Sequence, residues 1–126
     1  MERKELAVKF KHSGYNCAQA VIAAFCDITG MSMDESAALG AAFGMGMGCM
    51  KATCGAAVGA GIVLGKMKYG GGPVPPKARL LLTEFEKMCG ATICGDLKGI
   101  GTGKVLCPCD DCVRNAVTIL EKILEQ

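Results

Sequence analysis

GMGMGCMKATCGAAVGAG, residues 44–61, is the most informative stretch of the chain because it is rich in glycine and carries Cys49 and Cys54. A dinucleotide-binding loop needs G-x-G-x-x-G between a strand and a helix, but here the third glycine is misplaced and a helical pattern comes first. A phosphate-binding loop needs Gly-Lys followed by Ser or Thr, which is missing. We therefore expect residues 44–48 to form an irregular link. A helix should follow from Cys54 to about Lys68, with Thr53 as its N-cap.

The glycines of that helix occur in pairs four residues apart, Gly55 with Gly59 and Gly61 with Gly65. Residues four apart lie on the same face of a helix. A glycine inside a helix costs about 1 kcal/mol relative to alanine, so two such pairs predict that another backbone packs closely against this helix. We expect the helix in the middle of a bundle, with Cys54 at its tip.

The rest of the chain is typical of helices joined by glycine-rich connections, since apolar residues recur at helical spacing and no segment alternates as a strand does. The prediction is an all-α fold, a single-domain bundle of about five to six helices over residues 1–126. Asn16 and Asp34 are the expected N-caps, and Leu39 and Phe43 are expected to face inward. The expected helices cover residues 2–12, 17–28, 35–43, 54–68, 77–89 and 109–126, with one further helical turn at residues 94–97.

Composition excludes several classes of function. The 126 residues carry a formal net charge of +2, and the basic residues are scattered rather than gathered on one stripe, so we expect no nucleic-acid partner. No apolar run reaches the ~18 residues that a membrane span needs. The first residues lack the apolar core of a secretion signal. We expect a cytoplasmic protein with no membrane span.

Nine cysteines are the main chemical feature, and in a chain without an export signal they favour metal or redox chemistry over a disulfide framework. Several of them fall at expected helix starts, where the helix dipole and free N–H groups stabilise a thiolate. If these helix starts converge, they form a site for anionic sulfur. The cysteines at or near helix starts are Cys17, Cys54, Cys94, Cys109 and Cys112.

The other cysteines suggest different roles. Cys26 lies late in its helix and Cys89 ends one, where the dipole disfavours a thiolate, so we expect both to be structural. The secondary candidates are Cys49, Cys107 and Cys109, the first two as resolving thiols or spares. Cys109-Asp-Asp-Cys112 is a C-x-x-C motif, which is typical of metal binding or a redox disulfide, although the βαβ context of thioredoxin is absent.

Four segments together resemble a known family: GYNCAQA at residues 14–20, TCGAAVG at residues 53–59, CGDL at residues 94–97, and Cys112-Val113. They resemble the family of redox-active proteins named for the cysteine pattern C…CGAxxG…C…C, written C_GCAxxG_C_C. The resemblance implies a small, largely helical protein whose motif cysteines are Cys17, Cys54, Cys94 and Cys112. A related domain of split-Soret cytochromes is associated with an iron–sulfur centre, which implies that these four cysteines are ligands of a cluster.

Three functions remain open at this point. In the first, Cys17, Cys54, Cys94 and Cys112 form one redox site, cycling between dithiol and disulfide or holding an iron–sulfur cluster. Its partner would be another redox protein, and the chain would act as an oxidoreductase or electron carrier. In the second, the same four cysteines form a structural zinc site.

In the third, methionines flanking Cys49 help to bind Cu(I) in a trafficking adaptor associated with transport. These are Met45, Met47 and Met50. The segment 44–50 also suits a homodimer interface.

Overall fold

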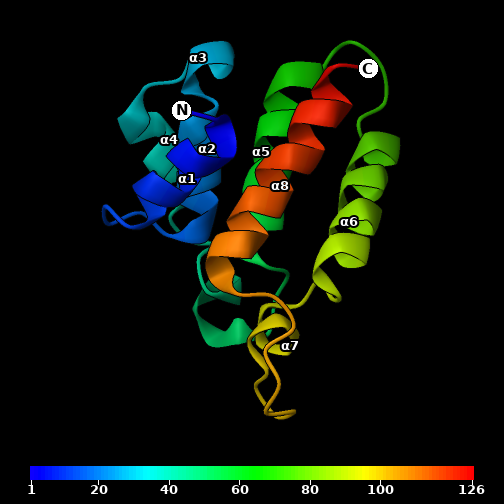
Figure 1. Cartoon of the computed structure of the whole chain (residues 1–126). Helices are drawn as coiled ribbons and strands as arrows, with labels where there is room; N and C mark the ends of the chain where they lie inside the picture. The colour runs from blue at the N-terminus through cyan, green and yellow to red at the C-terminus, as the bar shows by residue number, and fades with distance from the viewer.

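The computed structural model describes residues 1–126 and contains nine helical elements and no strand (Figure 1). The all-α prediction is confirmed. An isolated bridge between Thr53 and Ile93 is the one piece of β pairing. The elements are α1 (Arg3–Lys11), α2 (Cys17–Ala24), α3 (Cys26–Thr29), α4 (Met33–Gly40), η1 (Gly46–Met50), α5 (Gly55–Lys68), α6 (Pro75–Cys89), α7 (Cys94–Lys98) and α8 (Cys109–Leu124).

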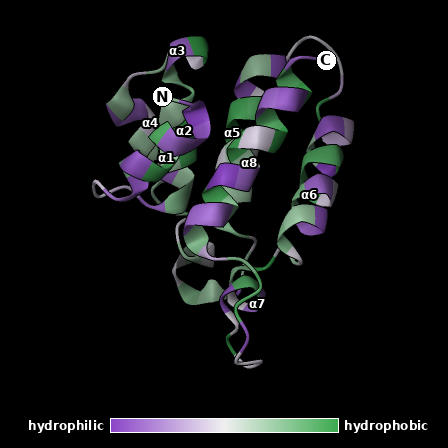
Figure 2. Ribbon diagram, viewed as in Figure 1, coloured by the Kyte–Doolittle hydropathy of each residue, from purple (hydrophilic) through white to green (hydrophobic).

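Helices α5 and α8 form the centre of the bundle, with α1 to α4 on one side and α6 on the other (Figure 1). Helix α5 has no polar side chain before Lys66, as suits a central helix. Helix α8 instead carries both polar and apolar residues along its length (Figure 2). The core contains the fully buried side chains of Phe25, Phe85, Ile22, Leu64 and Leu120. The short α7 lies at one end of the bundle, beneath the first turns of α5 and α8. None of the helices has the length and apolar character needed to cross a membrane.

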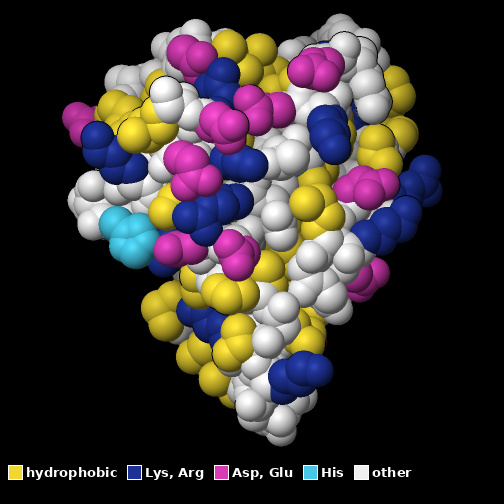
Figure 3. Space-filling view, in the orientation of Figure 1, with side chains coloured by type: hydrophobic (Ala, Val, Ile, Leu, Met, Phe, Trp, Pro, Cys, Tyr) yellow, Lys and Arg dark blue, Asp and Glu magenta, His cyan; other side chains and the backbone are white.

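The two ends of the molecule differ in surface character (Figure 3). Lys, Arg, Asp and Glu side chains gather over α1 and α8, where Arg114 pairs with Glu5 at 3.1 Å. The narrow end around α7 has few charged side chains on this face and exposes hydrophobic ones. Its exposed apolar side chains are Met45, Met47, Ile100, Val105 and Leu106.

Most helix boundaries lie within two residues of their predicted positions. The helix predicted over residues 35–43 is found as Met33–Gly40, and three further differences concern a break and two caps. The helix predicted over residues 17–28 breaks at Phe25, whose backbone leaves the helical region. Helix α4 is capped by Ser32, not Asp34, because the Ser32 hydroxyl accepts the Glu35 N–H at 3.0 Å. Helix α5 has Cys54 itself as N-cap, not Thr53, because Thr53 is held in its bridge with Ile93.

Two predictions about packing are wrong: that Leu39 faces inward, and that Gly61 and Gly65 meet another backbone. Leu39 is 44% exposed, because its side of the short α4 faces solvent. Gly61 and Gly65 have no atom within 4 Å of where a Cβ would lie, so nothing packs closely against that face of α5.

The prediction for the other glycine pair is confirmed. A Cβ on Gly59 would lie 2.7 Å from the carbonyl oxygen of Ala18, and one on Gly55 would lie 2.6 Å from the carbonyl oxygen of Phe43. Ala18 belongs to the first turn of α2. The glycines therefore allow the start of α2 to rest on the start of α5.

Replacing Asn16 with alanine is expected to lower the free energy of unfolding by about 1–2 kcal/mol. Its side chain accepts the Gln19 N–H at 2.8 Å, Gln19 returns a bond to the Asn16 N–H, and its amide donates to the Gly40 carbonyl at 3.2 Å. Urea unfolding measures the loss. Ser32→Ala is the matched control, since it removes one cap bond alone, and a smaller loss for Asn16→Ala than for Ser32→Ala would contradict the assignment.

Candidate functional site

Seven of the nine cysteines gather at the α7 end of the bundle, which we call the cysteine-rich end. The helix starts of α2, α5, α7 and α8 and the last residue of α6 supply them, together with one residue of the loop before α8. The prediction that cysteines from distant segments lie at helix starts is confirmed for α2, α7 and α8. The seven are Cys17, Cys54, Cys89, Cys94, Cys107, Cys109 and Cys112.

Backbone contacts explain why the starts of α5 and α7 lie together. The Cys54 N–H donates to the Thr92 carbonyl at 2.8 Å, and the Cys94 N–H donates to the Ala52 carbonyl at 3.0 Å. These bonds flank the bridge between Thr53 and Ile93. Two segments forty residues apart thus present Cys54 and Cys94 on the same end of the bundle.

The methionine-rich link closes over Cys94. Gly46 has a φ of 57°, and a Cβ there would lie 2.7 Å from the Cβ of Cys94. Met45, Met47 and Met50 also have positive φ values, between 54° and 63°. Left-handed backbone at residues other than glycine costs of order 1–3 kcal/mol each and clusters at functional sites. The irregular link predicted from the glycines is therefore a strained turn packed on the cysteine-rich end.

An open pocket of about 430 Å³ enters the cysteine-rich end from solvent. Four cysteines line it, each from a different helix start, and two lysines stand beside them. No Asp, Glu or His lines it. The lining residues used below are Cys17, Cys54, Cys94, Cys109, Lys11 and Lys98.

Within this open pocket, Cys17 and Cys109 form a thiol–thiolate pair. The hydrogen bond from the Cys17 thiol, reinforced by the charges of Lys98 and Lys11, lowers the pKa of Cys109 to about 5. The same bond, together with burial, raises the pKa of Cys17 far above its ordinary value. Cys109 is thus anionic at neutral pH, while Cys17 keeps its proton.

A second pair lies behind the first. Cys54 accepts a hydrogen bond from the Cys112 thiol and from the backbone N–H groups of Ala56 and Ala57, which together lower the pKa of Cys54. Hydrogen bonds to Cys54 and Cys89, with burial, raise the pKa of Cys112. The start of α5 therefore stabilises negative charge on Cys54, as its position at a helix N-terminus predicts.

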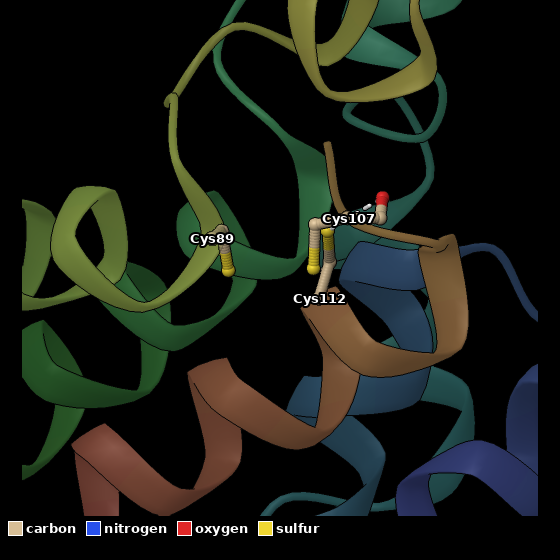
Figure 4. Close-up of side chains that lie close together, drawn as sticks. All are labelled: Cys89, Cys107 and Cys112. Atoms are coloured by element: carbon tan, nitrogen blue, oxygen red, sulfur yellow. Dashed lines mark hydrogen bonds between the residues drawn. The ribbon is translucent and has the colours of Figure 1, made fainter. Parts of the chain in front are cut away.

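Cys112 also belongs to a compact buried triad with Cys89 and Cys107, in which the three Sγ atoms lie within 4.8 Å of one another (Figure 4). Hydrogen bonds from Cys112 and from the Asn115 amide lower the pKa of Cys89 to about 6. Burial raises the pKa of Cys107 to about 11. We refer to Cys89, Cys107 and Cys112 as the buried triad.

The four cysteines chosen from the sequence do not all face one cavity. Cys17, Cys54 and Cys94 line the open pocket, and Cys109 rather than Cys112 is the fourth cysteine there. Cys112 lies behind it, linked to the open pocket through Cys54.

The remaining cysteines have separate surroundings. Cys26 lies outside the cysteine-rich end, within 3.2 Å of the Ser36 hydroxyl. Cys49 is exposed on η1. From the sequence, Cys89 was expected to be structural because it ends a helix. One signal could have placed it in the buried triad: it precedes Gly90, where the chain turns toward α7.

The pH dependence of alkylation checks the thiolate at Cys109. With iodoacetamide, the rate at Cys109 is expected to be half-maximal near pH 5 and flat at pH 7, because its pKa is about 5. In Cys17→Ala the midpoint moves to higher pH, since the hydrogen bond that favours the thiolate is gone. Cys26→Ala is the control and keeps the wild-type midpoint. An unchanged midpoint in Cys17→Ala would refute the pairing.

One of the comparisons with known proteins identifies a family. A family profile matches residues 15–123, which is most of the chain and spans all seven clustered cysteines. The family's short name writes the central segment as Gly-Cys-Ala, whereas residues 54–56 of the chain read Cys-Gly-Ala. Neither the search of curated proteins nor that of solved structures finds a match.

Family and site support the same broad role. The matched family is described as redox-active, and the buried triad groups three thiols within metal-binding distance of one another. Together they support a redox or metal-binding role. The chain belongs to the family described as "Putative redox-active protein (C_GCAxxG_C_C)".

Proposed function

We propose that this protein carries electrons by thiol–disulfide exchange, with Cys17 and Cys109 as the dithiol that is oxidised and reduced. The proposal is supported by the position of Cys17 and Cys109 in the lining of the open pocket, where the Cys17 thiol and two lysines lower the pKa of Cys109. A thiolate is the form that attacks disulfides. Cys109 is anionic at neutral pH and a second thiol lies within hydrogen-bonding reach, so both halves of an exchange reaction are in place.

The reaction has two steps. The Cys109 thiolate attacks one sulfur of a disulfide R–S–S–R′, which forms a mixed disulfide with R–S and expels R′–S⁻. Cys17 then loses its proton and attacks the Cys109 sulfur, which forms the Cys17–Cys109 bond and expels R–S⁻. Two electrons pass from the protein to the bound disulfide, and the one proton released goes to a departing thiolate. In the reverse direction, an external dithiol reduces the protein.

The surrounding residues support this chemistry. Lys98 and Lys11 stabilise the thiolate of Cys109. The Lys11 Nζ forms an ion pair with the Asp110 carboxylate at 2.9 Å. Lys98 is therefore the lysine that can move with the sulfur that carries the negative charge. Cys54 and Cys94 complete the sulfur wall of the pocket, and Cys54 connects it to Cys112.

Equilibrium titration against dithiothreitol buffers tests the proposal. The wild-type protein is expected to lose two thiols reversibly in one two-electron step, and Cys26→Ser is expected to do the same. Cys17→Ser and Cys109→Ser should each lose this step, because either change removes one half of the dithiol. Retention of the step in both variants would refute Cys17–Cys109 as the redox pair.

An iron–sulfur cluster in the open pocket is a second candidate, favoured by one observation. Four cysteines from four helix starts line the pocket and no carboxylate or imidazole competes with them, which is the ligand set of a cluster. The cluster would be held by Cys17, Cys54, Cys94 and Cys109. The family pattern differs in one ligand, because it has Cys112 in place of Cys109. A bound cluster supplies one-electron chemistry. The N–H groups of Ala56 and Ala57 already point at Cys54 and would tune the electron affinity there.

Anaerobic purification, a visible absorption spectrum and an iron assay distinguish the two candidates. A brown protein with about two irons per chain would favour the cluster. A colourless, iron-free protein that gains no colour when supplied with iron and sulfide would leave the dithiol as the working centre.

A further inference from the structure

We propose that the buried triad of Cys89, Cys107 and Cys112 is a second site, separate from the open pocket, that binds one Cu(I) ion. The three side chains come from the end of α6, the loop before α8 and the first turn of α8. Their Sγ atoms lie within 4.8 Å of one another, and each residue is no more than 5% exposed. A small shift of the side chains would place all three sulfurs around one ion.

The donor set selects the metal. Thiolates are soft ligands and favour Cu(I) over the hard cations. Structural zinc requires four ligands, whereas this group offers three and is closed to solvent. The nearest carboxylate in the sequence, Asp111, turns away and pairs with Arg114 at 2.9 Å. Three sulfurs without an oxygen or nitrogen ligand suit a three-coordinate Cu(I).

A polar contact beyond the sulfurs supports a site for charge rather than simple packing of small apolar side chains. The Asn115 Nδ2 donates to the Sγ of Cys89 at 3.3 Å and points toward the Sγ of Cys107 at 4.0 Å. Amide donors around metal-bound sulfur orient the ligands and stabilise their negative charge. One turn of α8 thus supplies both a ligand, Cys112, and the donor that holds the other two.

The structure also provides a route into the site. A narrow cavity of about 10 Å³ is lined by Cys54, Cys109, Cys107 and Cys112. The first two of these residues also line the open pocket, and the last two belong to the buried triad. An ion that reaches the open pocket can therefore pass from sulfur to sulfur into the buried triad.

Metal binding here is a ligand exchange without oxidation. Each thiol that ligates Cu(I) releases its proton, and the copper gives up the ligands that delivered it. The Cys112 Sγ lies 3.6 Å from the Cys107 carbonyl oxygen, which is one of several acceptors within reach of its single proton, and that proton leaves when the sulfur binds copper. Because Cys112 also bonds Cys54, a bound ion withdraws Cys112 from the second thiol pair.

Competition with the chelator bicinchoninate, using Cu(I) supplied anaerobically as its acetonitrile complex, tests the site. The wild-type protein is expected to retain one equivalent, and Cys89→Ser and Cys107→Ser to lose affinity by at least about a hundredfold. Asn115→Ala keeps every ligand and should lose about tenfold. Cys17→Ser removes the redox pair but leaves the small cavity and the buried triad unchanged. Cys17→Ser and Cys26→Ser should therefore retain copper as the wild type does, so this result is independent of the redox pair.

Copper retention by Cys89→Ser and Cys107→Ser would overturn the proposal, as would its loss in Cys17→Ser. A measurement on the unchanged protein removes any dependence on the folding of the variants. X-ray absorption of the one-copper form should show three sulfur neighbours. Two sulfurs, or a copper–copper distance, would contradict a single ion in the buried triad.

Discussion

Replacing Gly59 with valine is expected to lower the free energy of unfolding by about 3 kcal/mol, at the upper end of the cost of overpacking a core. A Cβ at this position lies 2.7 Å from the Ala18 carbonyl oxygen. The obstacle is backbone, not the flexible end of a side chain, so α2 and α5 must separate. Urea unfolding followed by circular dichroism measures the loss.

The same change should disturb the site. Contact between Gly59 and Ala18 places Cys17, the residue before Ala18, beside Cys54 at the start of α5. Separation of the helices moves Cys17 away from Cys109, so the pKa of Cys109 is expected to rise in Gly59→Val.

Gly61→Val is the matched control, because it lies two residues along the same helix and a Cβ there meets no atom within 4 Å. Its free energy of unfolding should stay within about 0.5 kcal/mol of the wild type. Equal losses at Gly59 and Gly61 would show that the contact with α2 does not set the cost.

Cys109→Ser is expected to slow the reaction with dithiodipyridine at pH 6 by about tenfold, because the larger thiolate fraction of Cys109 outweighs the lower nucleophilicity that accompanies its low pKa. With a pKa of about 5, most Cys109 is thiolate at this pH. A thiol with an ordinary pKa is less than about 1% ionised there. The remaining thiolate-favouring cysteines, Cys54 and Cys89, are buried. Stopped-flow absorbance of the released thiopyridone gives the rate.

Cys26→Ser serves as the control for loss of one thiol and should react at the wild-type rate. Cys112→Ser should also keep the fast phase, because Cys112 lies behind the open pocket and does not bond Cys109. A fast phase of unchanged rate in Cys109→Ser would place the reactive thiolate on another cysteine and refute the assignment.

Local signals in the sequence predicted the ends of most helices. Asn16 caps α2, and Gly30 and Gly90 end α3 and α6 in the left-handed conformation, as expected of those residue types. Such features depend on a few neighbouring residues. Ser32 and Asp34 are both good caps, and only the hydrogen bond to Glu35 decides between them.

Contacts between distant segments were harder to predict. Gly55 and Gly59 have the same spacing as Gly61 and Gly65, yet only the first pair meets another backbone. Periodicity gives the face of a helix but not its neighbour. The choice between Cys109 and Cys112 for the open pocket depends likewise on how α8 is rotated about its axis.

Cys89 shows the limit of an argument from one helix alone. Its position at the end of α6 predicts a disfavoured thiolate, yet the hydrogen bonds from Cys112 and Asn115 lower its pKa to about 6. Both donors are on α8, and nothing near Cys89 in the sequence indicates them. Direct hydrogen bonds from a distant segment outweigh the dipole of its own helix.

Peptide mapping of the first disulfide formed is the most direct test of the redox centre. The reduced, anaerobically purified protein is treated with one equivalent of dithiodipyridine, its free thiols are blocked in acid, and the linked peptides are identified by mass spectrometry. We predict a bond between Cys17 and Cys109. A first disulfide between Cys54 and Cys112, or one that includes Cys26 or Cys49 while Cys17 and Cys109 remain thiols, would contradict the proposed centre.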